Sequence, residues 1–313
     1  FMADQTTEPL PHGYRLSDYV IDRRIGGGGF SLVYLGFDAA GQPVAIKEYL
    51  PGGVVKRGEQ GPVHPVSVDK ESSFRYGMKC FFEEGRSLAG IRHPNVVKVI
   101  NFFRANDTVY MVMKYAQGKT LQRHIVGEEE PMRETFLRRV FIQLLNGLRE
   151  VHAHKILHLD IKPSNIYIRA DGSPLLIDFG AARHALSQDF ISSPMYTPGF
   201  AAPEQYKQRD RLGPWTDIYS VGATMYACMT KGPPPPADER MDKDKLSLLT
   251  KSHAGIYSKD LLDLVDSMLR LNYTERPQSV FSVQKQLINM AQAARSHKPN
   301  LFALIKERIT REL

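Results

Sequence analysis

Four polar residues at fixed short spacing lie near the middle of this chain, and they constrain its fold and chemistry more than any other feature. Asp160, Lys162 and Asn165 fall within six residues, and Asp178 follows 13 residues after Asn165. A carboxylate can orient a hydroxyl, an amine can balance charge on a moving phosphate, and amide and carboxylate oxygens are ligands for Mg²⁺. A lone Asp or Asn at such a place is usually a turn cap, but capping does not explain several in register. The pattern predicts a site for phosphoryl transfer.

Five short motifs contain or accompany these residues. They are Leu157-His158-Leu159-Asp160-Ile161-Lys162-Pro163-Ser164-Asn165, Asp178-Phe179-Gly180, Val44-Ala45-Ile46-Lys47, Ala202-Pro203-Glu204 and a Gly-rich turn at 25–33. Together they resemble the motifs of protein kinases over about residues 19 to 290. A lysine two residues after the aspartate is typical of Ser/Thr kinases, and the most similar group is the bacterial branch of the eukaryotic-like Ser/Thr kinases. The resemblance implies an α+β, two-lobed protein-kinase-like fold, with a small antiparallel sheet lobe plus one helix and a larger, mostly helical lobe.

Composition narrows the remaining classes. The 313 residues fit one large domain or two lobes, and the two cysteines, Cys80 and Cys228, form no Cys/His cluster that would hold zinc. This cysteine usage fits a reducing compartment, so we expect a cytoplasmic protein. No apolar stretch approaches the ~20 residues of a membrane span, and the first residues lack the apolar core of a signal peptide. A net charge of +7 fits a solvated basic surface, and we expect no nucleic-acid partner.

The first part of the chain reads as a flexible leader followed by a small lobe. Residues 1–18 are polar and rich in Pro and Gly, and 19–116 form the expected nucleotide-binding lobe, with a loop insert at about 50–72. Strands are expected at 19–25, 32–38, 44–47, 96–104 and 108–114, a hairpin turn at Asn106-Asp107, and a helix at 74–91.

The second part is expected to be mostly helical. Residues 117–290 form the expected catalytic lobe, with helices at 134–154 and from Ser258, and a non-helical connection at 233–236. A helical tail should follow at 291–313, where apolar residues recur every four positions. Three roles are open for this stripe: packing on its own domain, forming a dimer, or leading into a downstream regulatory region. Its members are Leu301, Ile305, Ile309 and Leu313.

The Gly-rich turn lies between two expected strands. Glycines let backbone N–H groups approach phosphate oxygens, although a plain tight hairpin explains the turn better when it is taken on its own. A dinucleotide-binding fold is excluded because a strand, not a helix, follows the glycines. By resemblance this is the kinase Gly-rich loop, with Ser31 in place of its third glycine.

The resemblance also assigns an ATP pocket. Lys47 would hold the α- and β-phosphates and pair with a helix glutamate, for which Glu84 fits the register better than Glu83. The spacing from Lys47 to Glu84 is 37 residues, longer than is usual, because of the insert. Two readings of the insert are open: a tolerated surface loop, or a regulatory or partner contact beside the helix that carries the glutamate. The expected ATP-binding residues are Ile25, Gly26, Gly28, Ser31, Val33, Ala45, Lys47, Met113 as gatekeeper, Lys114, Ala116, and Tyr167 in place of the usual aliphatic floor residue.

Roles in phosphoryl transfer follow from the same resemblance. Asp160 would accept the proton of a substrate hydroxyl, Lys162 would balance the γ-phosphoryl charge, and Thr197 would bridge these two residues. Asn165 and Asp178 would hold Mg²⁺, or Mn²⁺ in its place. Structural roles are expected for His158 beside Phe179, for a spine of Leu88, Val99, His158 and Phe179, for Asp217 as loop anchor, and for a Glu204–Arg276 pair.

One position departs from the family pattern. Leu159 stands where most kinases have an arginine that binds a phosphate on the activation segment, and a leucine cannot bind phosphate. We hypothesise that activity does not require that phosphorylation. Ser187, Ser192, Ser193 and Thr197 remain possible modification sites.

Three functions compete on these observations. The first is an ATP-dependent Ser/Thr protein kinase that transfers the γ-phosphoryl group to protein hydroxyls and also phosphorylates itself. The second is a pseudokinase-type binding scaffold, which the filled positions at Lys47, Glu84, Asp160, Asn165 and Asp178 disfavour. The third is a small-molecule kinase, which generally lacks the Ala-Pro-Glu motif and its distant arginine.

Overall fold

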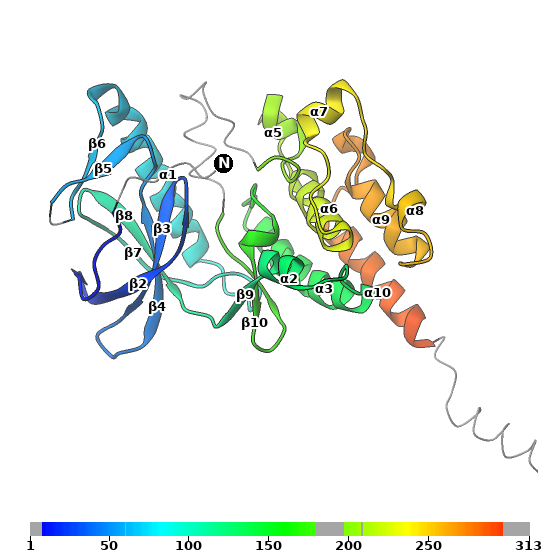
Figure 1. The fold of residues 1–313 in the computed structure, drawn as a ribbon, viewed down its shortest axis with the longest axis horizontal. Helices are drawn as coiled ribbons and strands as arrows, with labels where there is room; N and C mark the ends of the chain where they lie inside the picture. The colour runs from blue at the N-terminus through cyan, green and yellow to red at the C-terminus, as the bar shows by residue number, and fades with distance from the viewer. Residues whose placement is uncertain (1–7, 60, 180–196, 208, 297–313) are drawn as a thin grey trace, which may run out of the picture.

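The chain folds into two lobes. The computed structural model describes residues 8–59, 61–179, 197–207 and 209–296. A sheet and one long helix form the smaller lobe, and helices dominate the larger one, as Figure 1 shows. The expected α+β, two-lobed architecture is confirmed.

The small lobe is built on an antiparallel sheet with strand order β1-β2-β3-β4-β8-β7. Its strands are β1 (Arg15–Leu16), β2 (Tyr19–Gly28), β3 (Ser31–Phe37), β4 (Pro43–Tyr49), β7 (Val99–Ala105) and β8 (Thr108–Lys114). Asn106 and Asp107 between β7 and β8 both have positive φ, at 50° and 56°, which is the conformation of a tight hairpin turn. The expected hairpin is therefore present, although β7 begins three residues later than predicted because Val96 bridges instead to Leu176.

The register of this sheet separates its side chains into two faces, because residues directly opposite each other share a face. Val33 pairs with Lys47, and Ala45 pairs with Met113, so these residues lie on one face. Along β4 the next residue points the opposite way. The other face therefore carries Glu48, its partner Tyr110, and Tyr34 opposite Ile46.

Helix α1 (Glu71–Ala89) covers the Lys47 face. It begins three residues earlier and ends two earlier than predicted. Tyr49 of β4 stacks on Phe74 of α1 and packs at a tilt against Phe81, with ring centroids 5.8 and 5.5 Å apart. Phe74, Phe81 and Leu88 recur every seven residues and are all buried, so one stripe of the helix holds it against the sheet.

The described part of the predicted leader packs on the small lobe. Leu10 and Leu16 are buried, β1 pairs with β2, and the backbone of Gly13 and Tyr14 bonds to Ile21 at 2.8 and 2.9 Å. The prediction was wrong for residues 8–18 because their polar, Pro- and Gly-rich composition hid two apolar side chains whose partners lie on distant strands. Residues 1–7 lie outside the described residues.

The insert is also ordered, which corrects its reading as a loop. It contains β5 (Val55–Arg57), β6 (Val63–Pro65) and η1 (Val68–Lys70), and it buries Val55 and Val63. In Figure 1 this hairpin lies at the outer end of the small lobe, near α1.

A buried carboxylate joins the insert to the sheet. Glu48 is 0% exposed and accepts hydrogen bonds from Tyr34 Oη at 2.7 Å, Tyr110 Oη at 2.5 Å and Arg57 Nη2 at 2.6 Å. Tyr34 Oη also accepts from the backbone N–H of Leu10 at 3.2 Å. Burial and the neighbouring Glu48 charge raise the pKa values of both tyrosines above their usual range, so both stay protonated as donors.

We expect Tyr34→Phe to destabilise the protein by about 1–3 kcal/mol, because it removes one donor to a buried charge while keeping the ring. Urea unfolding followed by far-UV circular dichroism measures the change. Tyr76→Phe, at a side chain 42% exposed on α1, is the matched control and should shift the free energy of unfolding by less than about 0.5 kcal/mol. Equal effects from the two variants would contradict the importance of the Glu48 cluster.

The large lobe packs around α3. Its elements are β9 (Gly118–Thr120), α2 (Leu121–Gly127), α3 (Glu134–Ala153), η2 (Pro163–Asn165), β10 (Ile166–Arg169), β11 (Pro174–Leu176), α5 (Pro203–Lys207), η3 (Arg209–Arg211), α6 (Pro214–Thr230), α7 (Ala237–Asp242), α8 (Leu249–Ser252), α9 (Lys259–Met268), η4 (Tyr273–Glu275) and α10 (Val280–Ser296). The apolar stripe predicted for α3 is fully buried. The helix expected from Ser258 is α9, and the predicted non-helical connection at 233–236 is present.

The predicted start of the C-terminal tail at 291 does not coincide with a structural boundary. Helix α10 runs without interruption from 280 to 296, since the same apolar periodicity continues through 291. The tail residues 297–313, with the predicted apolar stripe, lie outside the described residues.

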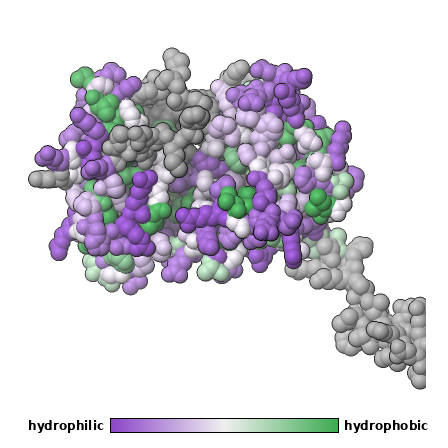
Figure 2. All heavy atoms as spheres, viewed as in Figure 1, coloured by the Kyte–Doolittle hydropathy of each residue, from purple (hydrophilic) through white to green (hydrophobic). Residues whose placement is uncertain are grey.

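The surface of the described chain carries mostly polar side chains. Figure 2 shows small, separate apolar spots among hydrophilic residues on the face it presents. Among the residues that the structure describes, every helix is too short or too polar to cross a membrane.

Candidate active site

A buried carboxylate holds the 157–165 loop. Asp217 of α6 accepts backbone hydrogen bonds from His158 at 2.9 Å and Leu159 at 2.8 Å, and it contacts His152 Nε2 at 2.8 Å. Burial would raise the pKa of Asp217, but the bond to His152 and the nearby histidines lower it below its usual value. These bonds support Leu159 at φ +61°, a left-handed conformation that leucine rarely adopts. The backbone of the loop is therefore fixed directly before Asp160.

His158 has a structural role. Its Nε2 donates to the carbonyl of Ile177 at 3.1 Å, its Nδ1 accepts from the N–H of Asp160 at 3.4 Å, and its ring stacks on Phe179 at 4.3 Å. Burial lowers the pKa of His158, which agrees with this neutral, fully bonded ring. With both nitrogens engaged, His158 is unsuited to act as a base, as predicted.

Asp160, Lys162 and Thr197 form a closed triangle. Lys162 Nζ donates to Asp160 Oδ1 at 3.0 Å and to Thr197 Oγ1 at 2.7 Å, and Thr197 Oγ1 lies 3.1 Å from Asp160 Oδ1. Thr197 belongs to the segment 197–207, which the chain reaches 35 residues after Lys162. The structure thus brings these three predicted residues together. Ser187, Ser192 and Ser193 lie outside the described residues.

Asn165 lies between the two aspartates. Its Nδ2 donates to Asp160 Oδ2 at 2.7 Å and to the carbonyls of Asp160 and Asp178 at 2.9 and 3.3 Å. These bonds direct the amide nitrogen toward the backbone and Asp160, so the amide oxygen is turned to the other side. The amide oxygen accepts from Ser164 Oγ at 3.4 Å. An amide oxygen and the carboxylate of Asp178 are the kinds of ligand that a hard divalent cation prefers. The residues present therefore fit the expected metal site.

Lys47 reaches Asp178 from the small lobe. Its Nζ lies 2.9 Å from Asp178 Oδ1 and 5.5 Å from the centroid of the Phe81 ring in α1. Glu84 lies one turn after Phe81, so both point from the same side of the helix, and Glu84 is buried. Glu83 instead faces solvent in an ion pair with Arg86. This orientation is the one required for Glu84 to serve as the partner of Lys47, a role that stays a prediction.

The residues predicted to bind the nucleotide line one face of the small lobe and the connection to the large one. Val33, Ala45, Lys47 and Met113 share the sheet face that α1 covers. The Gly-rich turn joins β2 and β3, with Ile25 exposed, Gly26 opposite Val33, and Gly28 opposite Ser31. Lys114 ends β8, and Ala116 follows in the connection to β9.

Tyr167 is tied to the connection between the lobes. Its hydroxyl donates to the carbonyl of Gly118 at 2.8 Å, and β10 pairs with β9. Gly118 has φ +157°, and a Cβ there would lie 2.1 Å from the carbonyl oxygen of Ile168, so only glycine fits. The Tyr167 phenol thus takes the place of the aliphatic floor residue usual in kinases, and it is hydrogen-bonded to the connection between the two lobes.

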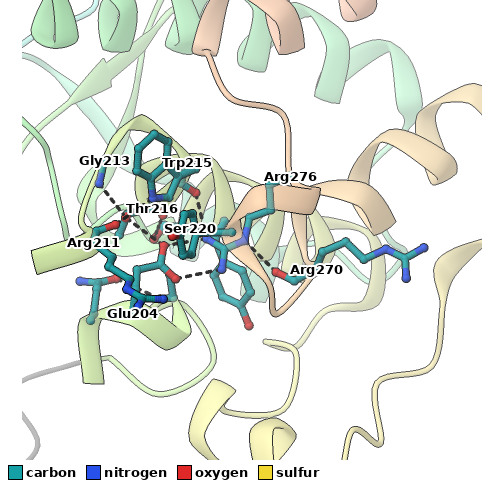
Figure 3. Close-up of polar contacts among 12 residues, drawn as sticks. Glu204, Arg211, Gly213, Trp215, Thr216, Ser220, Arg270 and Arg276 are labelled. Atoms are coloured by element: carbon teal, nitrogen blue, oxygen red, sulfur yellow. Dashed lines mark hydrogen bonds and ion pairs between the residues drawn. The ribbon is translucent and has the colours of Figure 1, made fainter. Parts of the chain in front are cut away.

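Glu204 and Arg276 form a buried bidentate pair. Arg276 Nη1 and Nη2 donate to the two carboxylate oxygens at 2.7 and 2.9 Å, and both side chains are at most 2% exposed. The remaining donors of Arg276 reach the carbonyls of Trp215, Arg270 and Leu271, and Thr216 Oγ1 donates to Glu204, as Figure 3 shows in part. Every N–H of the guanidinium is bonded, and the predicted pair is present.

Sequence reasoning missed three residues that support this site. His152 bonds to Asp217, Glu48 anchors the back of β4, and Gln205 contacts the 157–165 loop. None of them belongs to a spaced motif. A polar residue within an otherwise buried segment is the only signal that could have indicated them.

The fold and the site together define a protein kinase catalytic domain, in which Lys47 and Asp178 from two lobes meet beside the Asp160 loop. A family model described as "Protein kinase domain" matches residues 19–288, and the chain belongs to this family. Members use ATP together with a divalent metal ion.

Relatives and solved structures agree with this class. The chain is 28% identical over 275 residues to a carbon catabolite-derepressing protein kinase of Candida glabrata, covering 85% of this chain and 41% of that protein. It is 30% identical over 226 residues to the human hormonally up-regulated neu tumor-associated kinase, covering 70% of this chain and 29% of that one. The chain thus spans about two-fifths of the length of the first relative and less than a third of the second.

A solved structure named PpkA-294, in its apo form, has a TM-score of 0.83 and 34% identity, and covers 89% of this chain and 99% of its own. The kinase domain of Mycobacterium tuberculosis PknI, solved as a double mutant, has a TM-score of 0.67 at 18% identity, covers 91% of this chain and 100% of its own, and shows the fold alone. The predicted protein kinase catalytic domain is confirmed.

Proposed function

We propose that this chain transfers the γ-phosphoryl group of ATP to Ser and Thr hydroxyls of proteins, its own included. The observation that carries the proposal is one continuous polar network from Lys47 through Asp178 and Asn165 to Asp160, Lys162 and Thr197. A scaffold that only bound partners would have no need of this arrangement. Asp160→Asn tests the proposal directly, because a variant that transferred phosphate as fast as the unmodified chain would contradict it.

The residues divide the chemistry among them. Asp160 orients the acceptor hydroxyl and takes its proton, while Lys162 and Thr197 hold the Asp160 carboxylate in place and Lys162 balances charge on the transferred group. Lys47 binds the α- and β-phosphates after exchanging part of its contact with Asp178. The bond that forms joins the acceptor oxygen to the γ-phosphorus, and the bond that breaks releases ADP.

Asn165 and Asp178 would hold Mg²⁺, or Mn²⁺. When bound, this cation neutralises charge on the phosphate oxygens. Neighbouring structure positions both ligands. Asn165 is held by its hydrogen bond to Asp160, and Asp178 follows the short β11 strand. Ile25, Gly26, Gly28, Ser31, Val33, Ala45, Met113, Lys114, Ala116 and Tyr167 would enclose the nucleotide.

We also propose the division of labour and surroundings expected from the sequence. Residues 19–116 bind the nucleotide, 117–290 carry catalysis and the protein substrate, and the tail provides a dimer or regulatory contact. A cytoplasmic location fits the cysteine usage. Protein hydroxyls are favoured over small molecules because the Glu204–Arg276 pair is present.

The proposed enzyme works without phosphate on its activation segment. Leu159 offers no cation to such a phosphate, and Asp217 and the Asp160 triangle already hold the loop. We expect phosphatase treatment to leave the initial transfer rate within about twofold of a mock-treated sample, since no phosphate-dependent contact is lost. Radiolabel transfer to a generic protein acceptor, with phosphate removal verified by mass spectrometry, measures this. Complete loss of activity, restored by rephosphorylation at Ser187, Ser192, Ser193 or Thr197, would refute it.

A further inference from the structure

Gln205 makes a polar bridge between the segment 197–207 and the 157–165 loop. Its side chain is 1% exposed. The amide oxygen Oε1 accepts from the backbone N–H of Ala202 at 2.9 Å, and the amide nitrogen Nε2 donates to the carbonyl of Leu159 at 3.0 Å. A buried amide bonded on both ends fixes the distance between the two backbone segments it joins.

The contacted carbonyl belongs to the residue with the strained backbone. Leu159 has φ +61°, which is unfavourable for an L-residue with a branched side chain and persists only when its surroundings hold it. Asp217 holds its N–H at 2.8 Å and Gln205 holds its carbonyl at 3.0 Å, so both ends of the residue are fixed. Asp160 follows directly, so its position depends on this conformation.

We propose that Gln205 is a positioning residue that holds Leu159 in its left-handed conformation and thereby places Asp160 for transfer. Its two amide ends bond to the backbone of Ala202 and of Leu159, and it acts through the Leu159 carbonyl. Its neutral amide joins the segment 197–207 to the loop. Most kinases have a phosphate-binding arginine at position 159, and Leu159 cannot make that contact. The inference rests on the proposed function and assigns a means by which the loop stays ordered without phosphate.

Gln205→Met tests this, because methionine keeps the length and volume of the side chain and removes both hydrogen bonds. We expect kcat to fall about tenfold, which corresponds to about 1.4 kcal/mol of barrier. The KM for ATP should change less than about twofold, since the nucleotide is bound elsewhere. Gln286→Met, on the exposed side of α10, is the matched control and should keep both constants. The measurements use phosphatase-treated protein.

A second change separates positioning from general destabilisation. Asparagine tolerates the left-handed conformation far better than leucine. The factor by which Leu159→Asn changes kcat should therefore be about threefold or more larger in the Gln205→Met background than in the unmodified protein. A merely structural Gln205 would lower thermal stability without this rescue. An unchanged kcat in Gln205→Met, or a loss that Leu159→Asn does not relieve, would overturn the proposal.

A third readout does not depend on activity. Hydrogen–deuterium exchange of the peptide containing 157–165 should be faster in Gln205→Met than in the unmodified chain and unchanged in Gln286→Met. If the unmodified chain transfers no phosphate, the proposed function fails, and the exchange result alone decides whether Gln205 holds the loop. Equal exchange in all three proteins would then overturn the bridge.

Discussion

Asp160→Asn is expected to reduce phosphoryl transfer by about 10³-fold, equivalent to about 4 kcal/mol of barrier. The substitution keeps the size of the side chain but removes the charge and the basic oxygen that would take the proton of the acceptor hydroxyl. It also replaces an acceptor that now receives hydrogen bonds from Lys162 at 3.0 Å and Asn165 at 2.7 Å. Initial rates of radiolabel transfer from ATP to a generic protein acceptor measure the effect.

The control is Asp107→Asn. Asp107 lies in the β7–β8 turn with φ +56°, a conformation that asparagine tolerates well, so rate and stability should be retained. Equal transfer by the unmodified chain and Asp160→Asn would sink the catalytic proposal and point to a contaminating kinase. Absence of transfer from both, with ATP still bound, would favour the pseudokinase scaffold.

Local patterns allowed much of the fold to be predicted. The α3 stripe and the Asn106-Asp107 hairpin depend on residues close in sequence, where helix and strand periodicity decides. The preference for Glu84 over Glu83 came instead from the register of the kinase motifs. The site was predicted through motif resemblance, and the structure places the catalytic and metal residues beside one another.

Features that depend on distant partners escaped prediction. Leu10 and Leu16 looked like part of a polar leader because their neighbours in sequence are polar, yet they are buried in the core to which distant strands contribute. The insert looked like a loop because its Gly and Pro residues dominate its composition, while Arg57 finds Glu48 only in the folded sheet. Gln205 lies 46 residues from the carbonyl it contacts, and no spacing rule connects them.

The Glu204–Arg276 pair joins residues 72 apart in sequence and lies buried in the large lobe. Because both charges are buried, their desolvation is offset only while each has its partner. Arg276 also stacks over Tyr219 at 4.9 Å and bonds to three carbonyls, so it connects α5, α6 and the turn before η4. Removing it leaves the buried Glu204 carboxylate with the neutral hydroxyl of Thr216 in place of a charged partner.

We therefore expect Arg276→Met to lower the free energy of unfolding by about 3–5 kcal/mol and the melting temperature by about 10 °C. Arg75→Met, which removes an exposed arginine from its pair with Glu71 on α1, is the matched control and should cost less than about 1 kcal/mol. The double variant Glu204→Leu with Arg276→Met should be more stable than the sum of the single changes predicts, since no unpaired charge stays buried. Calorimetry of these variants beside the unmodified chain tests this. A single Arg276→Met variant as stable as Arg75→Met would mean that the pair is not what holds α5 to α6, and the segment 197–207 would then owe its position to other contacts, Gln205 foremost.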